Sequence, residues 1–363
     1  MSASSRRTLL RLMLGSTGGS LLAQRAARSA VIREDDPDNV KISHRINARS
    51  VTDDDLLFFQ QIGLRWARLE FGEQPITLDQ LRAAQQRFAK FGMQVHSGVH
   101  YSYRTTRVQL RQAGCDEDIA TYCDFVRNLG KLGIPIASYD FHPANTYTTN
   151  MVQRRGYTAR EFDLQDFRKK VEKQAFDREY SADDIWSNYT YFMKAVLPVA
   201  QEAGVKLALH PDDPPIAKMN GVAKLFTHYD GYRRAERIAT QIAGPGANWG
   251  LTFCVGTWSE GGDRMGKNVF EMIQDFGGRG KLLEIHFRNV SSPLPHFVEA
   301  FPDDGYMDMY QVMKALRQVR FSGSAEPDHV PKLAGDSGIL RAGTAYCIVY
   351  MRSLLRRANE EVG

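Results

Sequence analysis

The chain has few cysteines and no long apolar run. Its 363 residues contain four cysteines, which are scattered along the sequence: Cys115, Cys123, Cys254 and Cys347. These are too few for the disulfide framework of a small secreted domain. Cys115 and Cys123 could pair, but Cys123 falls in an amphipathic helical pattern that favours a core position. No stretch reaches the roughly 20 apolar residues that a transmembrane helix needs.

The body of the chain also lacks a net charge of one sign. The formal net charge is +5, and five arginines in the acid-free segment 1–30 account for all of it: Arg6, Arg7, Arg11, Arg25 and Arg28. The remaining residues have no overall charge that would attract a polyanion. This argues against nucleic acid as a partner, and so against a metal-dependent nuclease.

Residues 1–30 have the pattern of an export signal. Ser5–Leu10 resembles the twin-arginine signature, Leu9–Leu22 is modestly apolar, and small residues follow at Ala26–Ala30. We therefore expect a twin-arginine-type signal peptide over 1–30, the twin-arginine export machinery as a partner, and a periplasmic mature protein. A disordered basic N-terminus is the alternative. Export of this type implies that the protein crosses the membrane already folded, after a metal thiolate could form in the cytoplasm.

From residue 31 onwards, apolar runs alternate with helical patterns. Eight runs predict strands: Val40–Arg45, Leu64–Leu69, Gln94–Val99, Ile134–Phe141, Val205–His210, Trp249–Cys254, Leu282–Asn289 and Gly323–Asp328. The predicted helices lie between and after them: Asp53–Ile62, Leu78–Phe91, Glu117–Leu132, Ala182–Ala203, Tyr232–Gly244, Val269–Phe276, Met309–Val319 and Leu340–Arg357. Such alternation indicates parallel βα units. Eight units predict a single α/β domain over 31–363, a (β/α)8 TIM barrel.

The region from about 150 to 190 interrupts this alternation. It is charged and has no clear core pattern. Because it follows the fourth predicted strand, it belongs to the face of the barrel where active sites form. The sequence leaves open whether this insertion is a lid or a solvated helical segment.

A metal-type ligand ends each of the last four predicted strands: His210, Cys254, His286 and Asp328. Each residue alone has an ordinary structural explanation, such as a core cysteine or a turn cap. Together, at equivalent strand ends of a parallel barrel, they predict a metal site on its catalytic face. Thiolate favours softer metals, whereas carboxylate keeps harder ones possible.

Further polar residues surround these positions. Alternation along a strand would place Glu284 and Arg288 on one face. Arg288 suits a substrate carboxylate through its planar fork, and a structural salt bridge with Glu284 is the alternative. Asp212 and Asp213 follow His210 in a proline-rich turn, where either could hold a ligand or a substrate hydroxyl, or cap the turn. Asn289 is a further candidate for substrate binding.

Several blocks resemble the mannonate dehydratase family, a branch of the xylose-isomerase-like barrels. They are Leu209–Pro215, Gly250–Cys254, Ile285–Val290, Asp304–Met309 and Glu326–His329. The likeness covers most of residues 40–355 in order. It implies that the four strand-end residues hold a divalent ion, usually manganese, with iron or cobalt as alternatives. It also implies that His329 is an acid/base group.

The chain departs from the family pattern at two places. The family has Gly-Tyr before the last helix, and this chain has Gly343–Tyr346 (GTAY). Tyr346 is therefore a candidate for the second acid/base group from a shifted position, with Tyr306 as an alternative. The family's Trp-Thr-Arg run after the fourth strand is replaced by Asp140–Thr149, which contains His142, a polar substrate contact or a structural group.

The resemblance implies dehydration of a sugar acid, D-mannonate or a related aldonate, to a 2-keto-3-deoxy acid. Two alternatives remain open: a metal-dependent sugar isomerase or epimerase, and a non-catalytic periplasmic protein that binds sugar acids. The sequence also leaves open whether the protein forms a homo-oligomer.

Overall fold

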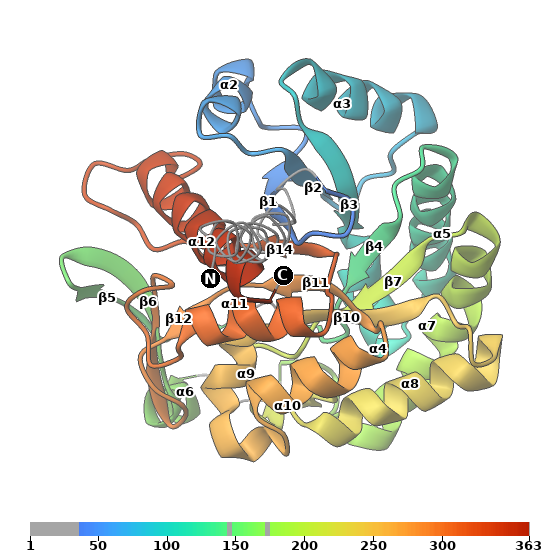
Figure 1. Ribbon diagram of the computed structural model, residues 1–363. Coiled ribbons are helices and arrows are strands. Elements are labelled where there is room, and N and C mark those ends of the chain that lie inside the picture. Colours follow the sequence, from blue (N-terminus) through green and yellow to red (C-terminus); the bar gives the residue numbers. More distant parts are fainter. Residues whose placement is uncertain (1–35, 144–146, 171–174, 363) are drawn as a thin grey trace, which may run out of the picture.

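Eight parallel strands close into a barrel surrounded by helices (Figure 1). The computed structural model of the protein describes residues 36–143, 147–170 and 175–362, so the expected signal peptide lies outside the described residues. The barrel strands are β1 (Lys41–Asn47), β2 (Trp66–Phe71), β3 (Gln94–His100), β4 (Ile136–Tyr139), β7 (Lys206–Leu209), β10 (Trp249–Cys254), β11 (Leu282–His286) and β14 (Ser324–Glu326). Each runs beside its neighbour in sequence, and β14 pairs with β1 to close the ring. The predicted (β/α)8 barrel is confirmed.

Helices follow the strands at the predicted places. The larger ones are α2 (Asp53–Gln61), α3 (Leu78–Lys90), α5 (Cys115–Lys131), α7 (Ala182–Ala203), α8 (Tyr229–Ala243), α11 (Met309–Gln318) and α12 (Arg341–Val362). Shorter pieces are α4 (Thr106–Leu110), α9 (Val255–Gly261) and α10 (Val269–Met272). Helix α7 begins at a Ser181 capping box and ends at Gly204, whose φ of 67° is the left-handed conformation that favours glycine.

Glu284 of β11 is a buried acid in the barrel interior. Its carboxylate accepts hydrogen bonds from the hydroxyls of Ser97 (2.5 Å), Ser138 and Thr252 (2.8 Å), which come from three other strands. The Arg68 Nε lies 3.8 Å from the same carboxylate. A buried charge is tolerated when it is paired and hydrogen-bonded in this way. Glu284 thereby links four strands across the barrel, beneath the site.

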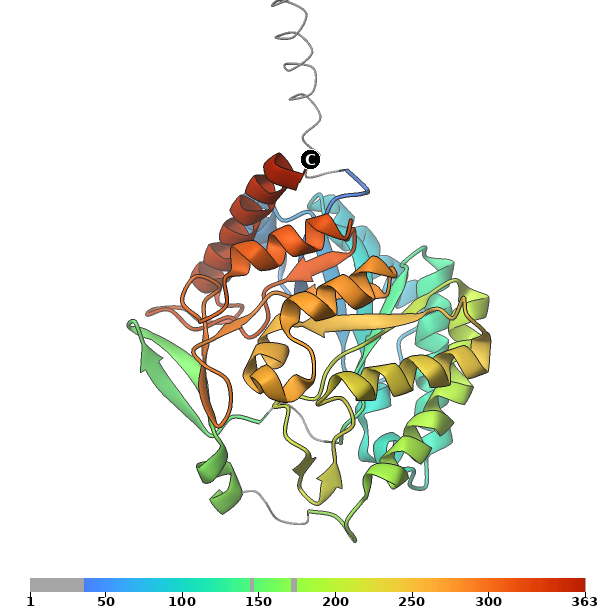
Figure 2. The same ribbon diagram turned by 60° about the horizontal axis from the view of Figure 1, so that its bottom comes forward.

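The insertion after β4 forms a β-hairpin followed by a short helix. The hairpin consists of β5 (Asn150–Arg154) and β6 (Tyr157–Asp163), and α6 (Leu164–Lys170) follows it. Strand β6 pairs antiparallel with β13 (His296–Ala300), which pairs with β12 (Asn289–Val290), so four strands form a second sheet outside the barrel. Figure 2 shows this hairpin standing to one side of the barrel. A purely helical insertion was one predicted alternative, and it is wrong for the hairpin segment.

None of the helices within the described ranges is both long and apolar enough to cross a membrane. The four cysteines are buried and unpaired. Cys123 therefore occupies a core position on α5, as the helical pattern predicted, and Cys115, the first residue of that helix, is buried as well.

We expect Gly250→Ala to lower the free energy of unfolding by about 1–3 kcal/mol, because overpacking a dense core forces its neighbours to move. A Cβ at Gly250 would meet the carbonyl oxygen of Lys281 and approach a Leu283 side-chain carbon to 2.8 Å. Urea unfolding followed by circular dichroism measures the effect. Gly246→Ala is the matched control, because nothing lies within 4 Å of a Cβ there. Equal midpoints for both variants would mean that the β10–β11 contact is not tight.

Candidate active site

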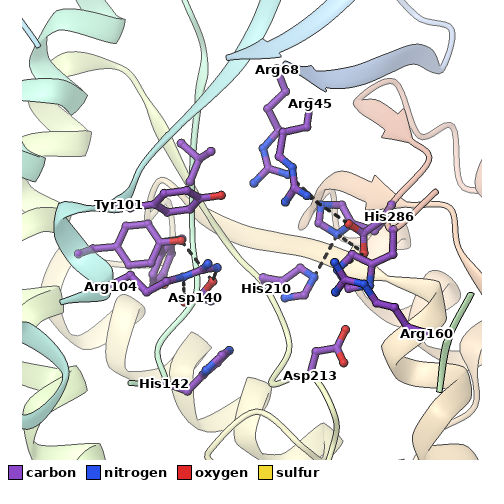
Figure 3. A pocket seen from close by; sticks show the side chains of 15 residues that line it. Arg45, Arg68, Tyr101, Arg104, Asp140, His142, Arg160, His210, Asp213 and His286 are labelled. Atoms are coloured by element: carbon purple, nitrogen blue, oxygen red, sulfur yellow. Dashed lines mark hydrogen bonds and ion pairs between the residues drawn. The ribbon is translucent and has the colours of Figure 1, made fainter. Parts of the chain in front are cut away.

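A polar pocket of about 250 Å³ opens where the barrel strands end at their carboxyl termini (Figure 3). Several predicted site residues line it: His142, His210, Asp213, His286, Asp328 and His329. A second hollow of about 490 Å³ adjoins it and shares Arg45, Arg160 and His329 with it. Active sites of parallel barrels form at this face.

The four predicted metal ligands converge beside this pocket. One ligand atom from each of His210, Cys254, His286 and Asp328 lies within 4.8 Å of the others. His210 follows β7, Cys254 and His286 end β10 and β11, and Asp328 follows β14 by two residues. The barrel therefore brings these four residues together, and their imidazole, thiolate and carboxylate groups form a donor set that suits a divalent transition metal.

Hydrogen bonds orient both imidazoles of this cluster. The Nδ1 of His210 lies 2.7 Å from the carbonyl oxygen of Pro211, to which it donates, so its Nε2 keeps a lone pair. The Nε2 of His286 lies 3.2 Å from Glu326 Oε1 and 2.9 Å from Arg68 Nη1, and the other ring nitrogens, His210 Nε2 and His286 Nδ1, are hydrogen-bonded to each other at 3.1 Å. Carboxylate and carbonyl partners of this kind fix the orientation of a metal-binding imidazole and the nitrogen that it offers to the metal.

Burial and neighbouring charges shift the pKa values of the cluster in different directions. Burial opposes protonation of His286, but Asp328 raises its pKa well above the ordinary value, so a metal would compete with a proton for this ring. Burial lowers the pKa of His210 well below its ordinary value, which leaves a neutral imidazole. Burial opposes ionisation of Asp328, but His329 and His286 hold its pKa well below the usual range. Burial likewise opposes ionisation of Glu326, but Arg68, 2.7 Å away, and His286 lower its pKa to about 2.

Arg288 is the buried centre of an ionic network next to the cluster. Its guanidinium lies 2.6 Å from Asp213 Oδ2, 2.6 Å from Glu260 Oε1 and 2.8 Å from Glu299 Oε1. It also donates to Cys254 Sγ at 3.5 Å. The side chain is 1% exposed. The N–H groups of Arg288, which the sequence suggested for a substrate carboxylate, are thus bonded to carboxylates of the protein itself.

His329 is positioned by one of these carboxylates. Its Nδ1 lies 2.7 Å from Glu299 Oε1, and its backbone has a φ of 49°, which is uncommon outside glycine. With Nδ1 donating to Glu299, the Nε2 is the nitrogen available for proton transfer. It lies 3.7 Å from Asp328 Oδ2, at the edge of the ligand cluster. This geometry fits the predicted acid/base role.

The structure corrects the prediction for Tyr346. This residue lies on α12, is 40% exposed and does not line the pocket. Its ring packs on Phe301 at 5.0 Å, and its hydroxyl interacts with Asp303 and Arg155. The alternative, Tyr306, donates to the backbone oxygen of Ser259. Neither residue lines the pocket.

Arg288, Asp212 and Asn289 are also placed differently from the prediction. None of the three lines the pocket. Arg288 pairs with the three acids described above, and its salt bridge with Glu284 does not form. Asp212 accepts a hydrogen bond from the Phe226 N–H at 2.7 Å, and Asn289 donates to two backbone carbonyls. These side chains support the loops around the site.

The pocket contains functional residues that the sequence analysis missed. Tyr101 and Arg160 line it, while Glu299 and Arg68 orient residues beside the cluster. Glu326 was not missed: alternation along the last predicted strand places it on the face of Asp328, where it can orient a ligand histidine, and it lies 3.2 Å from His286 Nε2. No sequence signal marks Glu299 or Arg160, because β13 and β6 reach the site through pairing between distant segments.

We expect Glu326→Gln to weaken manganese binding about 10- to 100-fold, because His286 loses the carboxylate that orients its ring. The affinity is measured by titrating manganese into purified protein and following free Mn²⁺ by electron paramagnetic resonance. Glu361→Gln on α12, far from the pocket, is the control and should bind manganese as the wild type does. An unchanged affinity in Glu326→Gln would show that His286 is held in place without this carboxylate.

Comparison with known proteins agrees with this geometry. Residues 158–361 match the family described as D-mannonate dehydratase (UxuA). The chain is 28% identical over 258 residues to mannonate dehydratase 2 of Halalkalibacterium halodurans, covering 64% of this chain and 72% of that enzyme. It is 32% identical over 248 residues to the mannonate dehydratase of Streptococcus equi subsp. zooepidemicus, covering 61% of this chain and 66% of that enzyme.

The solved structures lead to the same family. The crystal structure of mannonate dehydratase from Streptococcus suis serotype 2 superposes with a TM-score of 0.75 at 25% identity, covering 90% of this chain and 96% of that one. A xylose isomerase domain protein from Planctomyces limnophilus shares the fold, with a TM-score of 0.58, 11% identity, and coverage of 88% of this chain and 98% of that one. The chain therefore belongs to the D-mannonate dehydratase family, whose members are hydro-lyases.

Proposed function

We propose that this enzyme removes water from a sugar acid, D-mannonate or a closely related aldonate, and yields a 2-keto-3-deoxy acid. The observation that carries the proposal is the cluster of His210, Cys254, His286 and Asp328 with the oriented His329 at its edge. Family membership supports the same reaction class. Dehydration breaks the C2–H and C3–O bonds of the acid, and the resulting enol becomes the 2-keto acid.

The residues of the cluster fit a divalent metal, with manganese as the proposed ion and iron or cobalt as alternatives. The Nε2 of His210 and the Nδ1 of His286 lie 3.1 Å apart, beside the Asp328 carboxylate and the Cys254 thiol, so a single cation among them would be within reach of a donor atom from each of the four residues. When bound, such an ion acts as a Lewis acid that stabilises the negative charge formed next to the substrate carboxylate.

His329 is the proposed proton-transfer group. Glu299 holds its Nδ1, so that Nε2 faces the pocket and can take or give a proton at the reacting carbons. Elimination requires a second group that handles the other proton. Tyr101 and His142 are two candidates, since both line the pocket; the Tyr101 hydroxyl donates to Glu70 Oε1 at 2.7 Å.

The isomerase alternative uses the same fold but has no leaving group. It would interconvert two sugars without loss of water, so a 2-keto-3-deoxy acid would not form. The binding-protein alternative would retain metal and ligand but show no turnover. Product analysis therefore separates all three functions in one assay.

We expect manganese-loaded protein to form a 2-keto-3-deoxy acid from at least one member of a panel of aldonic and uronic acids. In His329→Asn, kcat should fall about 10²- to 10⁴-fold, the usual contribution of a general acid or base. Manganese content should stay at the wild-type level, because His329 is outside the ligand set. Tyr346→Phe, which lies outside the pocket, is the control and should retain kcat. Metal binding without keto acid from any panel member would refute the dehydratase proposal.

We also propose that the protein is exported to the periplasm by its twin-arginine-type leader. The support is the sequence pattern of residues 1–30, with paired arginines before a modest apolar run. Export of a folded chain would let the thiolate of Cys254 take up its metal in the cytoplasm, before it meets an oxidising compartment.

The double substitution Arg6→Lys/Arg7→Lys should keep the full-length chain in the cytoplasm of a bacterial host, because lysines preserve the charge but not the recognised pair. Cell fractionation and immunoblotting measure the distribution. Arg25→Lys/Arg28→Lys is matched in charge and should leave export unchanged. A periplasmic fraction that persists in the first variant would rule out the twin-arginine route.

A further inference from the structure

We propose that Arg160 of the insertion hairpin binds the carboxylate of the substrate, in the pocket next to the ligand cluster. The inference rests on the proposed function and names the group that recognises the acid. Arg160 lies on β6, outside the barrel. Figure 3 shows it reaching toward His286 from the side of the pocket opposite Tyr101 and Arg104.

The fold places Arg160 there through the second sheet. Its neighbour Glu161 pairs with Val298 of β13, and Phe162 pairs with Phe297, so β6 is held along the rim of the pocket. On the same strand, Tyr157 and Ala159 are buried against the body of the protein. The backbone of Arg160 is therefore held by strand pairing and by packing of its neighbours, and it does not lie in a loop.

Charge pairing distinguishes Arg160 from the other arginines of the pocket. Arg68 pairs with Glu326 at 2.7 Å, Arg104 pairs with Asp140, and Arg45 lies 3.5 Å from Glu70 and 3.9 Å from Asp328. The side chain of Arg160 has neither a hydrogen bond nor an ion pair with any residue that the structure describes. It is the pocket arginine whose donors remain free for a ligand.

The same contrast holds within the hairpin. Arg154 pairs with Asp304 at 3.0 Å, and Arg155 pairs with Asp303 at 2.7 Å. These two arginines fasten the hairpin to the segment that precedes α11. Arg160 makes no ion pair of this kind. A partly buried guanidinium without a partner destabilises the protein unless a ligand supplies a hydrogen-bond acceptor. A carboxylate matches its planar fork with two parallel hydrogen bonds.

This position also suits the chemistry of the reaction. Removal of the proton next to a carboxylate places a second negative charge on that group. A guanidinium bonded to the carboxylate therefore interacts more strongly with the transition state than with the bound substrate, and such interactions raise kcat. Arg160 would consequently select acids over neutral sugars and contribute to the rate, because it touches the reacting group.

The test compares D-mannonate with the neutral alditol D-mannitol by calorimetry on manganese-loaded protein. All variants carry His329→Asn, which slows turnover during the titration. We expect Arg160→Gln to weaken D-mannonate binding about 10- to 100-fold, as the loss of a charged hydrogen-bond pair does, and to leave D-mannitol binding unchanged. Arg160→Lys should recover part of the affinity, because the charge returns without the fork. Arg155→Gln, on the same hairpin, is the matched control and should keep wild-type affinity.

A second readout uses the enzyme with His329 intact. Arg160→Gln should lower kcat by a larger factor than it raises KM, and manganese content should not change. Equal D-mannonate affinity with and without Arg160 would overturn the inference, even if the wild type forms keto acid and the proposed function stands. Arg160-dependent binding without keto acid would support the anion site and refute the proposed function. No preference of any variant for D-mannonate over D-mannitol would overturn both.

Discussion

The site depends on the buried guanidinium of Arg288, which pairs with three carboxylates within 2.8 Å and with a fourth, that of Asp328, at 3.4 Å. Asp213 comes from the loop after β7, Glu260 from α9 and Glu299 from β13, so the ion pairs join three separate segments. Each acid would be strongly destabilising in this buried place without the cation. Because Glu299 also holds His329, the orientation of the proposed proton-transfer group depends on the same network.

The barrel and the sheet beside it contribute different residues to the site. The closed barrel holds the cluster on four adjacent strand ends, and Glu284 ties the strands together below it. The outer sheet of β12, β13, β6 and β5 supplies Glu299 and Arg160. Rigid strands thus set the ligand positions, while a smaller, antiparallel attachment brings the groups that orient His329 and face the substrate.

The sequence patterns predicted the eight strands and the four cluster residues because both follow from local periodicity. Apolar runs separated by helical patterns predict βα units, and a polar residue that ends such a run predicts a side chain at the rim. The alternation of side chains along a strand did not predict the position of Arg288 correctly, because β11 ends at His286 and Arg288 lies in the connection to β12. It could not place Tyr346 either, since a helix pattern does not say which side of the segment before α12 faces the pocket.

By itself, the sequence determined the barrel, the ligand types at its strand ends and His329 as the residue next to a ligand. These are properties of short segments, in which neighbours along the chain are neighbours in space. Tertiary structure alone decided that Glu299 orients His329, that Arg288 is consumed by protein acids, and that Arg160 stands unpaired in the pocket. The physical reason is that each of these depends on ion pairs or strand pairs between segments far apart in the chain, which no local pattern encodes.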